Sequence, residues 1–207
     1  MDAKKKCLVA TEADSPRVRD LRTKWIAWAS GVDPTRLVFI DEAGSTIAMT
    51  REYARAPRGQ RTSDSAPRNR GTVTTILGAL TLEGLAATMT IEGGTCGDVY
   101  VAFLEQVLAP KLEPGDLVVM DNAGAHKDPR VHEILARHGA KAIYLPPYSP
   151  DLNPIELAWS KLKSFLRTAK ARTVDSLNIA IAMGMEIISP EDAAAWFRHC
   201  GYSGQPT

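Results

Sequence analysis

Cysteine is scarce in this chain and widely spaced. The three cysteines among 207 residues are Cys7, Cys96 and Cys200, an odd number without a C-x-x-C pair. This pattern excludes a disulfide framework and gives no indication of a zinc site. A reducing, cytosolic environment is therefore the default expectation.

Long hydrophobic runs are also missing. No apolar stretch approaches the roughly 20 residues that a membrane-crossing helix needs. The N-terminus has a basic start, MDAKKKCLVATEAD, but no apolar block follows it, so a secretory leader is not expected. With 44% hydrophobic and 24% charged residues, the composition is typical of a soluble globular protein with one large domain.

The chain has almost no net charge, since the formal value is only +1. The distribution of charge is more informative than the total. Residues 51–70 contain six arginines against two acids, and residues 159–172 contain five basic residues and no acid. Two such segments suit a track for a polyanion, and they suit two solvated faces equally well.

Hydrophobic patterning predicts alternating strands and helices. Residues 15–29 look helical, with Ser15 as N-cap and Pro16 at the first helical position. Residues 36–41 (RLVFID) are typical of a buried strand, and residues 42–70 are expected to form a short helical turn and an irregular basic loop. The remaining elements are predicted as a hairpin of strands at 72–81 and 85–91, a helix at 98–108, a strand at 116–121, a helix at 129–138, a strand at 142–145, and helices at 154–168, 173–187 and 190–199.

This order of elements predicts an α/β fold. Three antiparallel strands followed by two βα units form a mixed five-stranded sheet flanked by helices. Right-handed crossovers place the fourth strand beside the first. The ends of the strands at 36–41 and 116–121 are therefore expected to be neighbours.

Acidic residues follow both of these strands. Asp41 comes directly after Leu-Val-Phe-Ile, and Asp121 comes in the same manner after Leu-Val-Val-Met. A third acid, Glu156, is separated from Asp121 by 34 residues and ends LPPYSPDLNPIE. Three carboxylates brought together repel one another unless a cation neutralises them, and hard oxygen ligands select Mg²⁺ or Mn²⁺. Such a site suits phosphoryl transfer.

Each acid has a structural alternative when it is considered alone. Asp41 and Asp121 could cap neighbouring loops, and Glu156 could return a capping-box hydrogen bond to Asn153. The side chain of Glu42 should point to the opposite strand face from that of Asp41, and an ordinary loop acid is the simpler interpretation of Glu42.

The helix that carries Glu156 has two distinct faces. Its apolar stripe, which should face the core, consists of Ile155, Trp159, Leu162 and Leu166. The adjoining face consists of Glu156, Ser160, Lys163 and Arg167. A carboxylate on the same ridge as two cations suits a metal site beside a phosphate backbone, although an ordinary amphipathic surface helix would look the same.

Asn122 and His126 follow Asp121 in DNAGAHK. His126 could bind phosphate, assist proton transfer or pack locally. Asn122 could brace Asp121, contact a phosphate or serve in a turn.

Four motifs together resemble a known family. They are FIDEAG at 39–44, RAPRGQR at 55–61, VVMDNAGAHK at 118–127 and LPPYSPDLNPIELAWSKLK at 145–163. From about residue 36 to the closing GYSG, the chain resembles the bacterial insertion-sequence transposases of the mariner superfamily, specifically the insertion sequence 630 family. Ala43 stands where the family often has Thr.

The resemblance implies a ribonuclease-H-like catalytic domain at 36–170, between an N-terminal helix and linker at 1–35 and a C-terminal helical extension at 171–207. Carried over to this chain, the catalytic and metal-binding triad is Asp41, Asp121 and Glu156. Two divalent ions, Mg²⁺ or Mn²⁺, serve in such enzymes to activate water and later a DNA 3′-hydroxyl, and to stabilise the leaving oxygen. Cleavage and strand transfer then share one site, typically with TA targets.

The implied partner is DNA, both element ends and target, bound by a homodimer in the bacterial cytoplasm at the nucleoid. DNA contacts are expected at Arg55, Arg58, Arg61, Asn122, His126, Lys127, Lys161, Lys163 and Arg167. Only about 35 residues precede the first strand, too few for the family's helix-turn-helix modules, so we expect a separately encoded helix-turn-helix protein, a frameshift fusion or a fragment. Two other functions remain open, a non-catalytic DNA-binding remnant and a structure-specific nuclease that cuts without joining.

Overall fold

Five strands form one mixed sheet in the order β3-β2-β1-β4-β5. This computed structural model describes residues 11–51 and 53–203, so Cys7 and the basic start lie outside the described residues. The strands are β1 (Leu37–Ser45), β2 (Thr74–Thr81), β3 (Gly84–Glu92), β4 (Leu117–Met120) and β5 (Lys141–Tyr144). β1, β2 and β3 are antiparallel, whereas β4 pairs in parallel with β1 and with β5. The predicted fold class and strand order are confirmed.

The strand register brings the first two acids to the same level of the sheet. Phe39 of β1 pairs with Val119 of β4, and Asp41 and Asp121 each follow two residues later. β4 ends at Met120, but β1 continues to Ser45 because β2 keeps pairing with it. Asp41 therefore lies within a strand, at the point where the β4 partner ends.

The segment after Asp41 differs from the prediction. No helical turn occurs in residues 46–51 or 53–70, so the predicted turn was wrong for this part of the chain. Residues 42–45 extend β1 instead, with Gly44 opposite Thr75 and Ser45 opposite Thr74. The reason is a distant partner, because these ladder bonds are made with β2.

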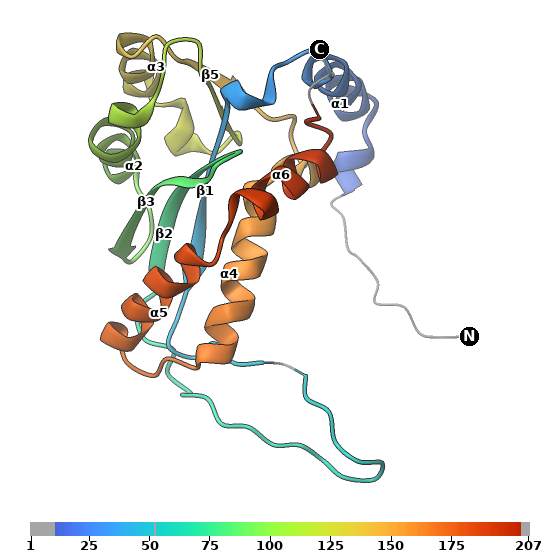
Figure 1. Cartoon of the computed structure of the whole chain (residues 1–207), viewed down its shortest axis with the longest axis vertical. Coiled ribbons are helices and arrows are strands. Elements are labelled where there is room, and N and C mark those ends of the chain that lie inside the picture. Colours follow the sequence, from blue (N-terminus) through green and yellow to red (C-terminus); the bar gives the residue numbers. More distant parts are fainter. Residues whose placement is uncertain (1–10, 52, 204–207) are drawn as a thin grey trace.

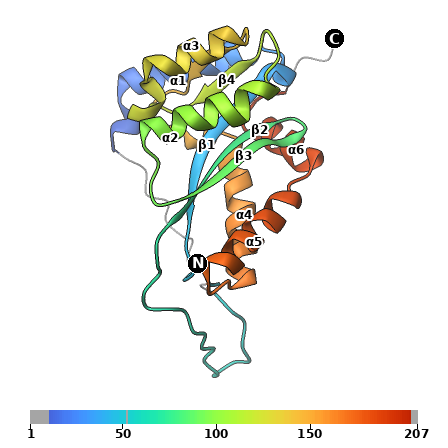
Figure 2. The same cartoon turned by 90° about the vertical axis from the view of Figure 1, so that its left-hand side faces the viewer.

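Helices cover both faces of the sheet (Figures 1 and 2). One face carries α1 (Pro16–Ala29), α4 (Ile155–Ala169), α5 (Val174–Glu186) and α6 (Pro190–His199), and the other carries α2 (Gly97–Phe103) and α3 (Pro129–Arg137). α2 continues through a π-helical turn, η3 (Leu104–Leu108). Among the described residues, no helix is long and apolar enough to cross a bilayer.

Strand alternation decides which side chains meet which helices. Leu37 and Phe39 of β1 pack in the core beneath α1, α4, α5 and α6, whereas Val38 and Ile40 pack beneath α2 and α3. Because side chains alternate along a strand, Asp41 belongs to the α4 face. The predicted apolar stripe of α4 is confirmed, since its four members are no more than 1% exposed.

A close approach between α4 and the sheet fixes the start of that helix. Gly78 of β2 pairs with Asp41, and a Cβ atom on Gly78 would clash with the Trp159 ring. Trp159 lies one turn after Glu156 in α4. The missing side chain at Gly78 therefore lets the first turn of α4 sit directly over the strand that carries Asp41.

Gly78→Ala is expected to destabilise the protein by about 1–3 kcal/mol, because Trp159 or β2 must move to admit the methyl group. The matched control is Gly94→Ala, where an added Cβ meets nothing within 4 Å, with an expected effect within about 0.5 kcal/mol. Urea unfolding measures both. Equal stabilities for the two variants would contradict the proposed contact.

Candidate active site

Asp41, Asp121 and Glu156 line one cleft of about 360 Å³. β1 supplies Asp41, the loop after β4 supplies Asp121, and the first turn of α4 supplies Glu156. The other walls of the cleft are formed by residues 145–150, Asn153, Asn122 and Arg17. The structure thus gathers the three acids that sequence patterning singled out.

Asp41 is the acid most affected by the others. Its pKa is raised to about 7, first by burial and then by the negative charge of Glu156, with smaller contributions from Glu42 and Asp121. A raised carboxyl pKa means that the folded protein disfavours the ionised form. The protein around Asp41 therefore does not neutralise the charge of its carboxylate.

Asp121 is held by its own loop. Its carboxylate accepts a hydrogen bond from the backbone N–H of Ala123 at 2.8 Å, and its Oδ1 lies 2.6 Å from Nδ1 of His126. These contacts keep the pKa of Asp121 below its usual value, with the His126 bond as the largest cause. Asp121 is consequently ionised and fixed in orientation.

His126 is a buried residue, so the predicted DNA contact at this position is wrong. The ring has no exposed surface, its centroid lies 4.3 Å from that of Tyr100, and its Nε2 lies 3.5 Å from Oε1 of Glu42. Burial lowers the pKa of His126, but the bonds to Asp121 and Glu42 outweigh that effect and raise it to about 9. The imidazolium thereby links Asp121 to Glu42, which belongs to β1 and not to a loop.

Glu156 has no structural partner in its own turn. Helix α4 has no side-chain hydrogen bond at its N-cap, and Oδ1 of Asn153 is buried without a partner, so the capping-box alternative is not formed. The helix begins at Ile155, one residue later than predicted. Glu156 is exposed and its carboxylate is available to the cleft.

The donor set of this cleft suits a hard divalent cation. Three carboxylates from three elements supply oxygen ligands of the kind that Mg²⁺ and Mn²⁺ prefer. Among residues 11–51 and 53–203, no three His, Cys, Asp or Glu side chains stand close enough to hold one ion. Asp121 is drawn toward His126, so the carboxylates share a cleft rather than a ready chelate.

Comparison with protein-family models identifies the chain. Residues 36–178 match the model described as the DDE superfamily endonuclease, which is more than half of the sequence. The chain belongs to the DDE superfamily endonucleases. No match was found among curated proteins.

The fold of this DDE domain is that of solved transposase structures. It is similar to the Mos1 transposase paired-end complex with left transposon end, with a TM-score of 0.76 and 16% identity over 97% of this chain and 64% of that one. The Mos1 mariner paired end complex with Mn gives 0.75 and 18% over 97% and 64%. The catalytic domain of Mos1 mariner transposase gives 0.61 and 14% over 93% and 90%. The chain thus spans about two thirds of the complexed Mos1 chains, and the ribonuclease-H-like fold is confirmed.

Two predicted DNA-contact residues lie near the acids of the DDE cleft. Asn122 lines the cleft, but its amide also donates a hydrogen bond to the carbonyl of Leu145 at 2.6 Å, so Asn122 braces the loop against the end of β5. Lys127 is exposed in the short turn η5 (Gly124–Lys127). Its contact with DNA stays a prediction.

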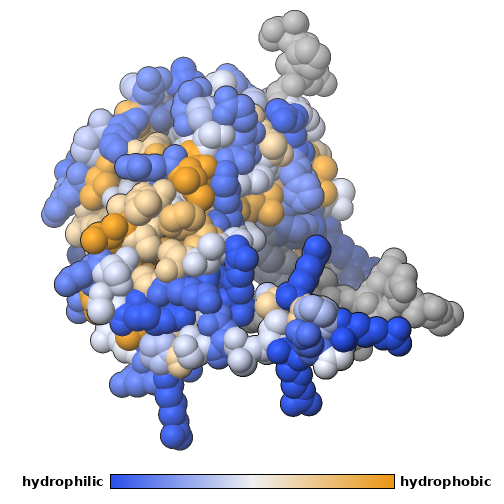
Figure 3. All heavy atoms as spheres, turned by 60° about the horizontal axis from the view of Figure 1, so that its bottom comes forward, coloured by the Kyte–Doolittle hydropathy of each residue, from blue (hydrophilic) through white to orange (hydrophobic). Residues whose placement is uncertain are grey.

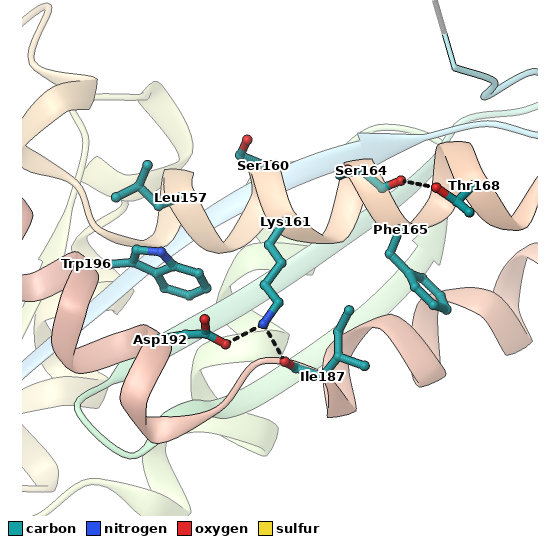
Figure 4. Close-up of a pocket in the computed structure, with 9 residues that line it drawn as sticks. All are labelled: Leu157, Ser160, Lys161, Ser164, Phe165, Thr168, Ile187, Asp192 and Trp196. Atoms are coloured by element: carbon teal, nitrogen blue, oxygen red, sulfur yellow. Dashed lines mark hydrogen bonds and ion pairs between the residues drawn. The ribbon is translucent and has the colours of Figure 1, made fainter. Parts of the chain in front are cut away.

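Lys161 does not line the cleft, and its contact with DNA stays a prediction. Its ammonium donates hydrogen bonds to the carbonyl of Ile187 at 2.8 Å and to Asp192, within a groove between α4 and the α5–α6 segment (Figure 4). Trp196 and Phe165 line the same groove. Lys161 lies five residues after Glu156, and at 3.6 residues per turn this spacing turns it to another side of the helix.

Lys163 and Arg167 remain on the ridge that begins with Glu156. Both are partly exposed. Their spacing of seven and eleven residues from Glu156 corresponds to about two and three helical turns. They extend a line of positive charge from the cleft toward the C-terminal end of α4.

A basic arm, residues 46–51 and 53–73, projects from that end of α4 (Figure 1). Its predicted DNA contacts Arg55, Arg58 and Arg61 are exposed, and hydrophilic side chains project from this side of the molecule (Figure 3). The base of the arm is anchored. Arg172 donates to the carbonyls of Ile47 and Met49 at 2.9 Å and to that of Ser65 at 3.2 Å.

Sequence reasoning missed two residues that the fold adds to the cleft. Arg17 comes from α1, outside the matched family region, and Tyr148 comes from the loop before α4. Nothing in the local pattern around Arg17 distinguishes it from Arg19 or Arg22. Tyr148 lies within the LPPYSPDLNPIE motif, but the sequence does not show that its ring is exposed.

Asp41→Asn is expected to stabilise the metal-free protein at pH 8 by roughly 1–4 kcal/mol, since one pKa unit corresponds to about 1.4 kcal/mol. The folded state keeps the Asp41 proton up to about pH 7, whereas the unfolded chain loses it near pH 3.9. Wild-type stability therefore falls through this window as pH rises, and the substitution removes that loss. Urea unfolding at pH 5 and pH 8 measures it, and a difference independent of pH would contradict the burial of ionised Asp41.

Arg172→Gln is expected to loosen the base of the arm. Each hydrogen bond to a charged group contributes about 1.5–3 kcal/mol, so trypsin should cleave within the arm at least about tenfold faster. The control is Arg137→Gln, since Arg137 pairs with Glu105 on the opposite helical layer. Timed proteolysis with mass spectrometry locates the cuts. Unchanged cleavage within the arm would show that Arg172 does not hold it.

Proposed function

We propose that this DDE domain is the catalytic domain of a DNA transposase of the insertion sequence 630 type. In this role it performs metal-dependent phosphodiester cleavage and strand transfer of an insertion element. The observation that supports this proposal most directly is that Asp41, Asp121 and Glu156 line one cleft in a DDE superfamily endonuclease. The likeness to Mos1 complexes with transposon ends supports the same conclusion.

The three acids have distinct tasks in this proposal. Asp41, Asp121 and Glu156 hold two Mg²⁺ or Mn²⁺ ions, which when bound supply Lewis-acid activation of the attacking and leaving oxygens. His126 keeps the Asp121 carboxylate ionised and oriented. Glu156, exposed at the start of α4, is the acid with most freedom to adjust as the site fills.

The basic residues outline a path for DNA along α4. Thr168 lies twelve positions after Glu156, and at 1.5 Å per residue this spacing is about 18 Å along the helix. Thr168 accepts hydrogen bonds from Arg51 at the base of the basic arm. Lys163 and Arg167 lie between these points, so DNA that leaves the cleft along this ridge meets Arg55, Arg58 and Arg61 in the arm.

The proposed membership of the insertion sequence 630 type also implies an oligomeric state, a location and a target. The domain would act as a homodimer on DNA in the bacterial cytoplasm at the nucleoid, with insertion at TA dinucleotides. Recognition of the element's ends would fall to a helix-turn-helix module, whether separately encoded, joined by a frameshift or part of a longer protein of which this chain is a piece. Purification of the domain together with the product of the preceding reading frame would test this assembly.

The proposal is tested with purified protein, a duplex ending in a free 3′-hydroxyl and supercoiled target plasmid, with Mg²⁺, Mn²⁺ or EDTA. Wild type should nick and join only with divalent metal. Glu156→Gln should lower both rates at least about 100-fold, because removing an essential charge in the reaction costs several kcal/mol. Glu133→Gln, an exposed acid of α3, is the matched control and should leave both rates unchanged.

The outcomes separate the alternatives. DNA binding without metal-dependent turnover would favour the non-catalytic remnant. Cleavage without joining would favour the nuclease. Joining that persists in Glu156→Gln would remove Glu156 from the chemistry.

A further inference from the structure

One cation in the cleft comes from outside the family region. Arg17 lies in the first turn of α1 and lines the cleft together with Asp41, Asp121 and Glu156. The neighbouring arginines of α1 are already paired, Arg19 with Asp14 and Arg22 with Asp151. Within the part of the chain that the structure describes, no ion pair engages Arg17. Its guanidinium is exposed and free for a ligand.

Helix α1 is held firmly against the loop that leads to Glu156. Arg22 binds both carboxylate oxygens of Asp151 at 2.9 and 2.6 Å, and it donates to Ser149 at 2.7 Å. On the buried side of α1, Trp25 donates to the hydroxyl of Tyr202 at 2.9 Å. That hydroxyl donates in turn to the carbonyl of Leu152 at 2.6 Å. Arg17 is therefore presented to the cleft by a fixed helix.

An exposed aromatic side chain stands in the same cleft wall. Tyr148 is 51% exposed and has a φ of 56°, the left-handed region that bulky residues rarely adopt. Pro147 precedes it and Pro150 follows two residues later, so the loop has little freedom to relax. A strained, half-exposed ring at the edge of a reaction cleft is an observation that points to a ligand.

We propose that Arg17 and Tyr148 form a subsite for the DNA strand next to the scissile phosphate. Arg17 binds a neighbouring phosphate, and Tyr148 stacks on an unpaired base. This inference rests on the proposed function, because it takes the cleft as the place where DNA is cut and joined.

The chemistry of the two side chains fits this ligand. A guanidinium presents a planar fork of donors that matches the two free oxygens of a phosphodiester. Arg17 adds a positive charge to a cleft that is otherwise lined by three carboxylates and uncharged residues. The phenol ring offers a face on which any base can stack, and stacking is available only where the strand is unpaired. The occupant is thus a single-stranded segment rather than intact duplex.

The test measures binding with Ca²⁺ in place of Mg²⁺, so that no turnover is required. The probe is a mixed-sequence single-stranded oligonucleotide, labelled for anisotropy and carrying 2-aminopurine, titrated over a range of KCl concentrations. Arg17→Ala should weaken binding about fivefold or more and reduce the salt slope by about 0.7, the value for one phosphate contact on a single strand. Arg17→Lys keeps the charge but lacks the planar guanidinium, so its affinity should lie between those of wild type and Arg17→Ala.

The matched controls separate the subsite from general charge. Arg19→Ala removes the same charge from the same helix and should leave the affinity and the salt slope unchanged. Tyr148→Ala should abolish the quenching of 2-aminopurine that stacking causes, whereas Tyr148→Phe should keep it. Urea unfolding of all variants in the same buffer identifies any loss that comes from misfolding.

Two results would overturn the inference, and turnover by wild type separates it from the proposed function. Equal affinity and salt slope for Arg17→Ala and Arg19→Ala would overturn it, and so would quenching that survives Tyr148→Ala. If wild type turns over DNA and either of these results is seen, the proposed function stands and the subsite falls. If wild type binds through Arg17 and Tyr148 but shows no metal-dependent turnover, the two side chains bind single-stranded DNA and the proposed function falls.

Discussion

Electrostatic repulsion among three carboxylates is the constraint on which the rest of this structure depends. The register of β1 and β4 sets Asp41 and Asp121 side by side, and the packing of α4 brings Glu156 to the same cleft. The placement of Asp41 costs free energy while no cation is present, because burial and then the charge of Glu156 raise its pKa. An arrangement that lowers stability at one point of a fold is retained because it serves function.

The surrounding protein shows how that cost is controlled. His126 offsets the charge of Asp121 and of Glu42 on the face of the sheet that α2 covers, where Tyr100 of α2 shields it from solvent. Gly78 allows Trp159 to bring α4 close to β2, which positions Glu156 without using its carboxylate. His126 thus fixes Asp121, strand β1 fixes Asp41, and helix α4 fixes Glu156.

Much of the fold followed from the sequence because local patterns and chain topology agreed. Short apolar strands, two crossovers and their right-handedness were sufficient to place β4 beside β1, and hence Asp41 near Asp121. The period of α4 correctly predicted its buried face. The extension of β1 to Ser45 was not predictable in the same way, because it depends on ladder bonds to β2, which lies about thirty residues further on.

Side-chain roles were harder to predict than positions on elements. His126 and Lys161 have the polarity of DNA contacts, yet one is buried beneath Asp121 and the other is held by Asp192 across a groove. Arg17 joins the cleft only because Arg22 and Trp25 dock α1 beside the loop before α4. Each of these outcomes depends on contacts between segments far apart in the chain, which residue spacing does not encode.

The central claim is that the three acids share divalent cations, and the most direct measurement is a crystal structure of the protein with Mn²⁺, using anomalous scattering to locate the metal. The account predicts anomalous peaks in the cleft within about 2.0–2.3 Å of oxygens from Asp41, Asp121 and Glu156. Asp121 should remain within hydrogen-bond distance of His126. Manganese found only elsewhere, or bound in the cleft without Asp41 and Glu156, would contradict the account.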